Sequence, residues 1–465
     1  MRESYPDRID GEPAPPLWEQ TAAIIVIVML TGALIGPIFA PTQDETPVLR
    51  LIWLPVYVII IGLLVARAGM VARAWPAVLV LGGLVLHAWI SQYWSIDPET
   101  TSRRVIALAI TGAFSIYLGA AFPGPELPRL LMHAVLLMAV SSVLMVLAFP
   151  DIGLHRDVNA PLWRGIWYEK NQMGLVMVAG AVAAAACLAS GDRRRLLPVV
   201  TLITTSLLVL ATQSKTSLLC LAVGVGMIAG LSLMRRGGPA FAVVAVWVSV
   251  VVGATGGWLI LTNPAAVLEA LGKDPTLTGR TDIWDSIMRW VNDQPFTGYG
   301  YSAFWGRESV PAAFVREETG WSVPSAHNGW LDLLVQLGWP GAIAVGILMA
   351  GIALITVFRL AGAGVREGYW SAAYLGVFTL LSLSESVLLS HANLPWALFL
   401  AIVARALLPK PRLARAMISR RRRVHHTSHN LSVAHVRRAS PPPGILRARL
   451  RHPVGTREFS RAGDV

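Results

Sequence analysis

Runs of about 20 apolar residues recur along most of this chain, and they limit its fold more than any other feature. A helix needs roughly 20 such residues to cross a hydrocarbon core of about 30 Å. The runs do not alternate strictly between apolar and polar residues, which argues against the strands of a membrane barrel. With 54% hydrophobic and 14% charged residues, the chain also lies outside the soluble globular range. The sequence therefore predicts an all-α integral membrane protein.

About 12 transmembrane helices are predicted from the charged residues and the Pro/Gly breaks between apolar runs. They begin near Gln20, Val48, Trp75, Val105, Leu130, Asn171, Leu196, Ser217, Pro239, Asn328, Trp370 and Leu394. Lys and Arg accumulate in the short cytoplasmic loops of membrane proteins. Alternate connections carry Arg67, Arg73, Arg129, Arg193 to Arg195, Arg235, Arg236, Arg359 and Arg366. This asymmetry predicts that both termini are cytoplasmic.

The predicted organisation has a polytopic membrane domain, residues 20–408, preceded by a polar cytoplasmic segment, residues 1–19. Residues 262–327, between the ninth and tenth spans, are too long and too polar for a simple connector, so we expect a separate loop subdomain there. From Pro409 onward, residues 409–465 carry 14 Lys and Arg against 2 Asp and Glu, which accounts for the whole net charge of +12. This tail is predicted to be disordered and to contact anionic lipids rather than nucleic acid.

The predicted loop subdomain contains an amphipathic helix. In "TGRTDIWDSIMRWVNDQ" the apolar residues Ile283, Ile287 and Val291, together with Trp284 and Met288, recur at helical spacing. The turn-rich stretch "QPFTGYGYSAFWG" follows it. We therefore expect a small lid lying on the outer face of the membrane.

Polar residues at the outer ends of several predicted spans converge on one face. They are Arg103, Arg104, Arg164, Lys170, Asn171, Lys215, Arg280, His327 and Glu385. Cations on this side run against the positive-inside bias, so they call for an anionic partner such as a lipid-linked diphosphate. Guanidinium groups match phosphate oxygens in bidentate geometry. Each of these cations taken alone could equally anchor a helix end or pair with a nearby carboxylate.

His327 and Glu385 are the candidates for proton transfer. His327 is predicted at the start of a helix with Ser325 as its N-cap, where the positive end of the helix disfavours imidazolium and leaves a neutral base. Glu385 lies in an otherwise apolar span, and a carboxylate in that setting suggests function, with the arginines or His327 as partners. An interfacial structural histidine and an ion pair that fixes helix packing are the alternatives.

Four motifs, in this order and spacing, resemble the O-antigen ligase and polymerase superfamily, and within it the exopolysaccharide-polymerase branch. They are "GIWYEKNQMG", "ATQSKTSLL", "GRTDIWDSIMRWVNDQPFTGYGYSAF" and "SAHNGWLDLLVQLGWPGAI". The resemblance covers about residues 163–393. It implies a multispan enzyme of the bacterial inner membrane with a periplasmic active site. Such enzymes transfer a glycan from an undecaprenyl diphosphate carrier to a sugar hydroxyl, and no nucleotide, metal or other cofactor is implied.

The resemblance implies catalytic roles for Arg280 and His327, to which we add Glu385 as a partner. The residues predicted to bind substrate are Lys215, Arg164, Lys170, Asn171, Arg104 and Asn328. Lys215 stands where many ligase-type relatives have arginine, and a lysine there weakens bidentate phosphate binding.

The predicted function is polymerisation of carrier-linked repeat units into exopolysaccharide, with an acceptor glycan as second substrate. An O-antigen ligase that transfers the glycan to lipid A core remains open, as does a flippase for the same lipid-linked glycan. Polysaccharide export and chain-length proteins are further expected partners.

Overall fold

The structure, a computed structural model, describes residues 14–39, 47–157, 160–191, 194–262, 280–360 and 365–409. All of them belong to one unit, Met1–Pro409. Most of the predicted N-terminal segment, the first part of the predicted loop (263–279) and the basic tail beyond Pro409 lie outside the described residues. What the sequence predicts for those segments stays a prediction.

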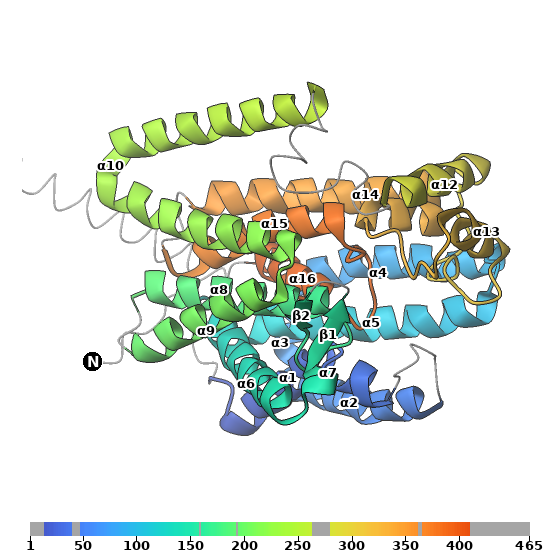
Figure 1. The fold of residues 1–465 in the computed structure, drawn as a ribbon. Coiled ribbons are helices and arrows are strands. Elements are labelled where there is room, and N and C mark those ends of the chain that lie inside the picture. Colours follow the sequence, from blue (N-terminus) through green and yellow to red (C-terminus); the bar gives the residue numbers. More distant parts are fainter. Residues whose placement is uncertain are drawn as a thin grey trace, which may run out of the picture. The chain divides into compact units, whose positions relative to one another are not determined.

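Helices dominate the described part of the chain (Figure 1). They are α1 (Leu17–Met29), α2 (Pro47–Ala66), α3 (Ala68–Arg73), α4 (Trp75–Ile90), α5 (Pro98–Ala121), α6 (Glu126–Ala148), α7 (Pro150–Gly153), α8 (Lys170–Ala189), α9 (Leu196–Thr212), α10 (Lys215–Thr262), α12 (Arg280–Asp293), α13 (Val310–Thr319), α14 (Gly329–Leu360), α15 (Val365–Ser384) and α16 (Leu394–Leu407), with the short turns η1 (Ile35–Phe39) and η2 (Ser91–Tyr93). The two strands β1 (Leu154–Asp157) and β2 (Ala160–Trp163) form an antiparallel hairpin in which Leu154 pairs with Trp163. The mainly helical fold was predicted, whereas this hairpin was not.

Each predicted span coincides with a helix or with half of one. Six of the described helices are long and apolar enough to cross a membrane: Trp75–Tyr93, Pro98–Ala121, Glu126–Ala148, Lys170–Ala189, Lys215–Gly238 and Gly329–Leu360. Shorter apolar helices are Leu17–Met29, Leu51–Ala66, Leu196–Thr212 and Leu394–Leu407. These features are those of a multi-pass α-helical membrane protein. The total of twelve spans and the side on which the loop lies stay predictions.

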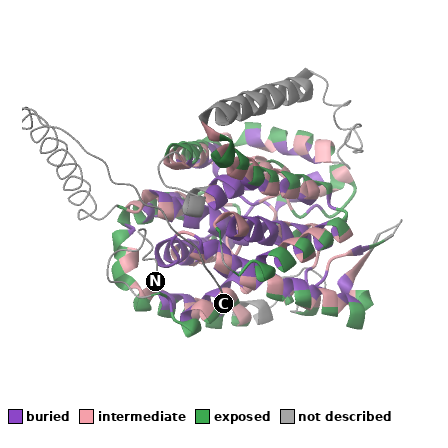
Figure 2. Cartoon of the chain, turned by 90° about the vertical axis from the view of Figure 1, so that its left-hand side faces the viewer, coloured by how far each residue is buried: buried purple, intermediate pink, exposed green. Residues whose placement is uncertain are grey.

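Helix α8 lies at the centre of the packing, in contact with α6, α9, α10 and α15. Its alanine-rich sequence lets neighbouring backbones approach closely, as small residues do at helix interfaces in membranes. A methyl group added at Gly174 would collide with the Ser217 side chain, and one added at Gly180 would collide with Val135. Figure 2 shows the buried residues concentrated along the inner helices, with exposed residues on the outward faces.

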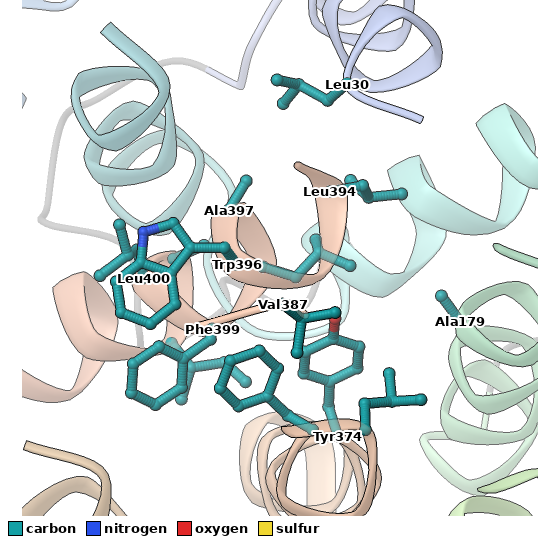
Figure 3. Close-up of a cluster of buried hydrophobic side chains, with 14 of the residues drawn as sticks. Leu30, Ala179, Tyr374, Val387, Leu394, Trp396, Ala397, Phe399 and Leu400 are labelled. Atoms are coloured by element: carbon teal, nitrogen blue, oxygen red, sulfur yellow. The ribbon is translucent and has the colours of Figure 1, made fainter. Parts of the chain in front are cut away.

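An aromatic cluster joins α15 and α16 near the centre of the fold. Figure 3 shows Tyr374, Trp396 and Phe399 gathered close to Val387. The Phe378 and Phe399 rings stack with centroids 4.7 Å apart. The cluster fixes the two helices at either end of the segment that carries Glu385.

Two long helices are broken at glycines. Gly238, with φ of +75°, divides α10 into the two spans that were predicted separately. Gly338, with φ of +62°, divides α14, which the sequence predicted as one uninterrupted span. Only glycine adopts this conformation without strain, so the residue type permits both breaks.

The loop after α12 satisfies the backbone groups that the break in α14 leaves open. Pro340 has no N–H, so the Gln336 carbonyl loses its helical partner and accepts instead from the Gly300 N–H at 3.0 Å. The Trp339 N–H in turn donates to the Pro295 carbonyl at 2.8 Å. Non-helical backbone at a membrane is tolerated where protein groups satisfy it in this way. The break therefore docks the loop against α14.

Replacing Gly338 by alanine is expected to destabilise the fold. A left-handed conformation costs an L-residue about 1–2 kcal/mol, and the added Cβ would lie 2.6 Å from the carbonyl carbon of Phe296. The matched control is Gly351→Ala in the same helix, because a Cβ there meets nothing within 4 Å. We expect a lower apparent melting temperature in detergent for Gly338→Ala alone. Equal melting temperatures for the two variants would show that the break does not constrain the fold.

Candidate active site

The described part of the lid consists of α12, α13 and their connections, packed beside the start of α14 (Figure 1). Helix α12 buries Ile283, Ile287 and Val291, as its sequence pattern predicts. Helix α13 was not predicted. It is capped by Ser309, whose side chain accepts from the Ala312 N–H at 3.3 Å.

A buried tyrosine helps to hold the lid loop. The Tyr299 hydroxyl donates to Asp293 Oδ2 at 2.8 Å. Burial, together with the hydrogen bond and the charge of Asp293, raises the pKa of Tyr299. The phenol therefore stays protonated at neutral pH and remains a donor.

The N-cap of α14 is Asn328, so the prediction of Ser325 was wrong. The Asn328 side-chain oxygen accepts from the N–H groups of Trp330 at 3.0 Å and Leu331 at 3.2 Å. His327 has a left-handed φ of +46°, which places it before the helix begins. The Ser325 hydroxyl instead accepts from the His327 N–H at 3.4 Å. Asn328, predicted to bind substrate, is thus also a structural residue.

The residue before His327 is held through both of its backbone polar groups. The Ala326 N–H donates to Asp332 Oδ1 at 3.1 Å, and the Ala326 carbonyl accepts from the Trp284 indole at 2.9 Å. Asp332 is buried and also accepts from the Trp305 indole at 2.6 Å. Side chains from the lid and from α14 therefore fix the backbone that carries His327. One feature of the sequence indicates this role, an aspartate inside an otherwise apolar helix.

Arg280, Glu385 and His327 meet although they come from three separate segments. Arg280 Nη2 lies 3.5 Å from Glu385 Oε1, and His327 Nδ1 lies 3.7 Å from Glu385 Oε2. Arg280 Nη1 also donates to the Ser384 carbonyl at 2.7 Å, at the carboxyl end of α15. The exposed fractions of the Arg280, Glu385 and His327 side chains are 21%, 13% and 16%. Each carboxylate oxygen of Glu385 thus faces one of the other two groups.

This arrangement can support proton transfer. A carboxylate near Nδ1 fixes the orientation and tautomer of an imidazole and leaves Nε2 to accept a proton. His327 Nδ1 is buried and has no hydrogen-bond partner among the described residues. The 3.7 Å contact with Glu385 is longer than a hydrogen bond, as catalytic contacts often are before substrate binds.

A cavity of about 360 Å³ opens beside the pair of His327 and Glu385. It is lined by Tyr168, Glu169, Asn171, Gln172, Leu175, Pro324, Ser325, His327, Glu385, Ser386, Val387 and Asn393. The start of α8, the end of the lid and the segment between α15 and α16 form its walls. Asn171 was predicted as a site residue. Glu169 and Gln172 belong to the same motif, "GIWYEKNQMG", but were not singled out, and Asn393 lies outside the four motifs.

The other predicted cations lie in different settings. Arg164 Nε donates to the Ile152 carbonyl at 2.7 Å, which braces the β1–β2 hairpin. Arg104 Nη1 donates to the Ser302 carbonyl at 2.9 Å and so holds the lid loop. Lys170 and Lys215 are the first residues of α8 and α10. These contacts favour anchoring roles for Arg104 and Arg164, whereas Arg280 lies against Glu385.

No group of three His, Cys, Asp or Glu side chains suited to a metal ion occurs within the described ranges. The two cysteines, Cys187 and Cys220, are buried thiols.

Comparison with known proteins finds a matching family over part of the chain. A family model described as O-antigen ligase matches residues 200–346. The resemblance to the O-antigen ligase and polymerase superfamily is confirmed. The matched O-antigen ligase segment includes Lys215, Arg280 and His327, whereas Arg164 and Glu385 lie outside it.

A curated relative supports the exopolysaccharide branch of the same superfamily. The chain is similar to the exopolysaccharide production protein ExoQ of Rhizobium meliloti (strain 1021), with 27% identity over 154 residues. The match covers 32% of this chain and 34% of ExoQ, so the chain spans about a third of that relative's length. Together the two comparisons support a function of the O-antigen ligase and polymerase type.

Proposed function

We propose that this chain is a glycosyltransferase of the bacterial inner membrane that polymerises undecaprenyl-diphosphate-linked repeat units into exopolysaccharide at the periplasmic face. The observation that carries the proposal is the meeting of Arg280, Glu385 and His327 beside a cavity of about 360 Å³. A base, its carboxylate partner and a cation are the groups that transfer of a sugar from a diphosphate requires. The similarity to an exopolysaccharide production protein supports the polymerase reading.

The proposed reaction is a direct displacement. His327 Nε2 takes the proton of the acceptor hydroxyl, whose oxygen attacks the anomeric carbon of the donor sugar. The bond between that carbon and the diphosphate oxygen breaks, and undecaprenyl diphosphate leaves with the electron pair. Arg280 stabilises the charge that develops on the diphosphate, while Glu385 stabilises the imidazolium. A single attack from the face opposite the diphosphate inverts the configuration at the anomeric carbon. Because the diphosphate is already a good leaving group, no covalent enzyme intermediate is needed.

Transfer of O-antigen to lipid A core is the second candidate, because the family match is described as O-antigen ligase. The donor chemistry is the same in both reactions, and the acceptor separates them. In a deletion strain, loss of high-molecular-weight exopolysaccharide supports the polymerase. Loss of long lipopolysaccharide with the polymer retained would instead support the ligase.

Complementation of that deletion strain tests the role of Arg280. We expect Arg280→Ala to fail to restore the polymer, and Arg280→Lys to restore it only partly because lysine lacks the planar fork. The control is Arg289→Ala in the same helix, since the Arg289 side chain is 63% exposed and pairs with Glu318. Polymer yield, normalised to the amount of membrane-inserted protein, is the measurement. Full restoration by Arg280→Ala would remove this residue from the mechanism.

A further inference from the structure

Trp321 is a half-exposed tryptophan that lies directly against the proposed base. Its ring stacks on the His327 ring, with centroids 6.3 Å apart and an interplanar angle of 23°. The residue is 46% exposed. A large apolar ring is thus held accessible next to the group that would deprotonate the acceptor.

Trp321 is more exposed than two other tryptophans of the lid, whose side chains have structural roles. Trp284 and Trp305 are partly buried, and their indole N–H groups hold the Ala326 carbonyl and the Asp332 carboxylate. They stabilise the lid from within. Trp321 instead offers its ring to His327 and to the surroundings.

The backbone around Trp321 is fixed. Gly320 ends α13 in a left-handed conformation, and its N–H donates to the Arg316 carbonyl at 3.0 Å. The Trp321 carbonyl accepts from the Val323 N–H at 2.8 Å, and Val323 is fully buried. Arg316 Nε then donates to the Val323 carbonyl at 3.2 Å. The position of the indole is therefore built into the lid.

The cavity beside His327 has the polarity of a site for a neutral, hydroxyl-rich ligand. Asn171, Gln172 and Asn393 contribute side-chain amides, and Glu169 contributes a carboxylate. The oxygens of Gln172 and Asn393 already accept from the Glu169 and Trp396 N–H groups, so these two residues serve the site mainly as NH2 donors. Among the described residues that line it there is no Lys or Arg. A diphosphate would lack a counter-charge in this wall, whereas sugar hydroxyls would find partners.

We propose that Trp321 and this cavity form the subsite for the acceptor sugar. The apolar C–H face of a pyranose stacks on the indole, and its hydroxyls bond to the amides, which brings one hydroxyl to His327. Sites that combine an aromatic surface with a few placed polar groups are typical for small ligands. This inference rests on the proposed glycosyltransferase function. It assigns the two substrates to separate subsites, with the acceptor in the cavity and the diphosphate at Arg280.

The test measures binding and kinetics on the full-length protein in detergent. The binding probe is the water-soluble repeat-unit oligosaccharide released from the polysaccharide of the strain that carries this chain. We expect Trp321→Leu, which keeps apolar bulk without a ring, to weaken binding about tenfold or more, and Trp321→Phe to stay within about threefold of wild type. With the carrier-linked repeat unit as substrate, Trp321→Leu should raise KM more than it lowers kcat. Trp339→Ala is the control, because Trp339 is equally exposed, at 47%, on α14.

The outcomes separate this inference from the proposed function. Wild-type binding by Trp321→Leu, or a fall in kcat at unchanged KM, would overturn the subsite and make Trp321 a residue that positions His327. Binding that depends on Trp321 in a protein that does not polymerise would uphold the subsite and refute the polymerase. If the protein polymerises and Trp321→Leu changes neither oligosaccharide binding nor KM, the polymerase is upheld and the subsite is refuted.

Discussion

Replacing His327 by alanine is expected to lower kcat about 10²- to 10⁴-fold, which is the contribution typical of a positioned general base. The reason is the geometry around the ring, where Glu385 lies 3.7 Å from Nδ1 and the cavity lies beside it. Binding of the lipid-linked donor should be retained, because the diphosphate is assigned to Arg280. The measurement is turnover of carrier-linked repeat unit by the purified protein.

Two controls make the His327 result specific. Exogenous imidazole should restore part of the activity of His327→Ala, because truncation to alanine enlarges a cavity that already measures about 360 Å³. His391→Ala tests a histidine that instead packs edge-on against Tyr301, with ring centroids 6.4 Å apart. It should retain most of the turnover. Near-normal turnover by His327→Ala would exclude His327 as the base.

Asp332→Ala is expected to have the second largest effect. Asp332 is 4% exposed and accepts from the Ala326 N–H and the Trp305 indole. Its removal leaves the buried Ala326 N–H without that partner, at a cost of about 1–3 kcal/mol, and the partly buried Trp305 indole loses its acceptor as well. It also releases the backbone next to His327, and a displacement of about 1 Å at a catalytic group can cost roughly 10² in rate. We expect turnover to fall about 100-fold and the apparent melting temperature to fall with it.

Asp332→Asn tests whether the hydrogen bonds accepted by Asp332 account for the losses of turnover and stability. Asparagine keeps one carbonyl oxygen at the same place, so it should recover part of both the stability and the activity. Asp282→Ala, at an exposed position of α12, should change neither. If Asp332→Ala kept wild-type turnover, the network around Ala326 would not position His327.

Local patterns predicted the helices well, and long-range contacts account for what they missed. Ile283, Ile287 and Val291 repeat at helical spacing within one segment, so the buried face of α12 could be predicted from the sequence. The break at Gly338 could not, because it depends on hydrogen bonds from the loop before it, such as Gly300 N–H to the Gln336 carbonyl. Gly338 and Pro340 permit an interruption at this point, but they do not show which groups would satisfy the freed backbone.

The candidate site was predicted only in part, because several of its features also depend on contacts between distant segments. Ser325 and Asn328 are both good N-caps, and the left-handed backbone of His327 decides between them in favour of Asn328. A guanidinium that braces a loop, as Arg164 does, cannot be told in a sequence from one that binds phosphate. The joining of Arg280, His327 and Glu385 followed from their chemistry. The polar wall of the cavity did not, because amides from α8 and from the segment before α16 carry no shared motif.

Reconstitution of the purified chain with undecaprenyl-diphosphate-linked repeat unit as the sole substrate shows whether it is a polymerase. We expect the glycan chains to lengthen, with one undecaprenyl diphosphate released for each repeat unit added and no nucleotide supplied. Movement of the lipid-linked unit across the bilayer without any lengthening would show that the chain is a flippase instead.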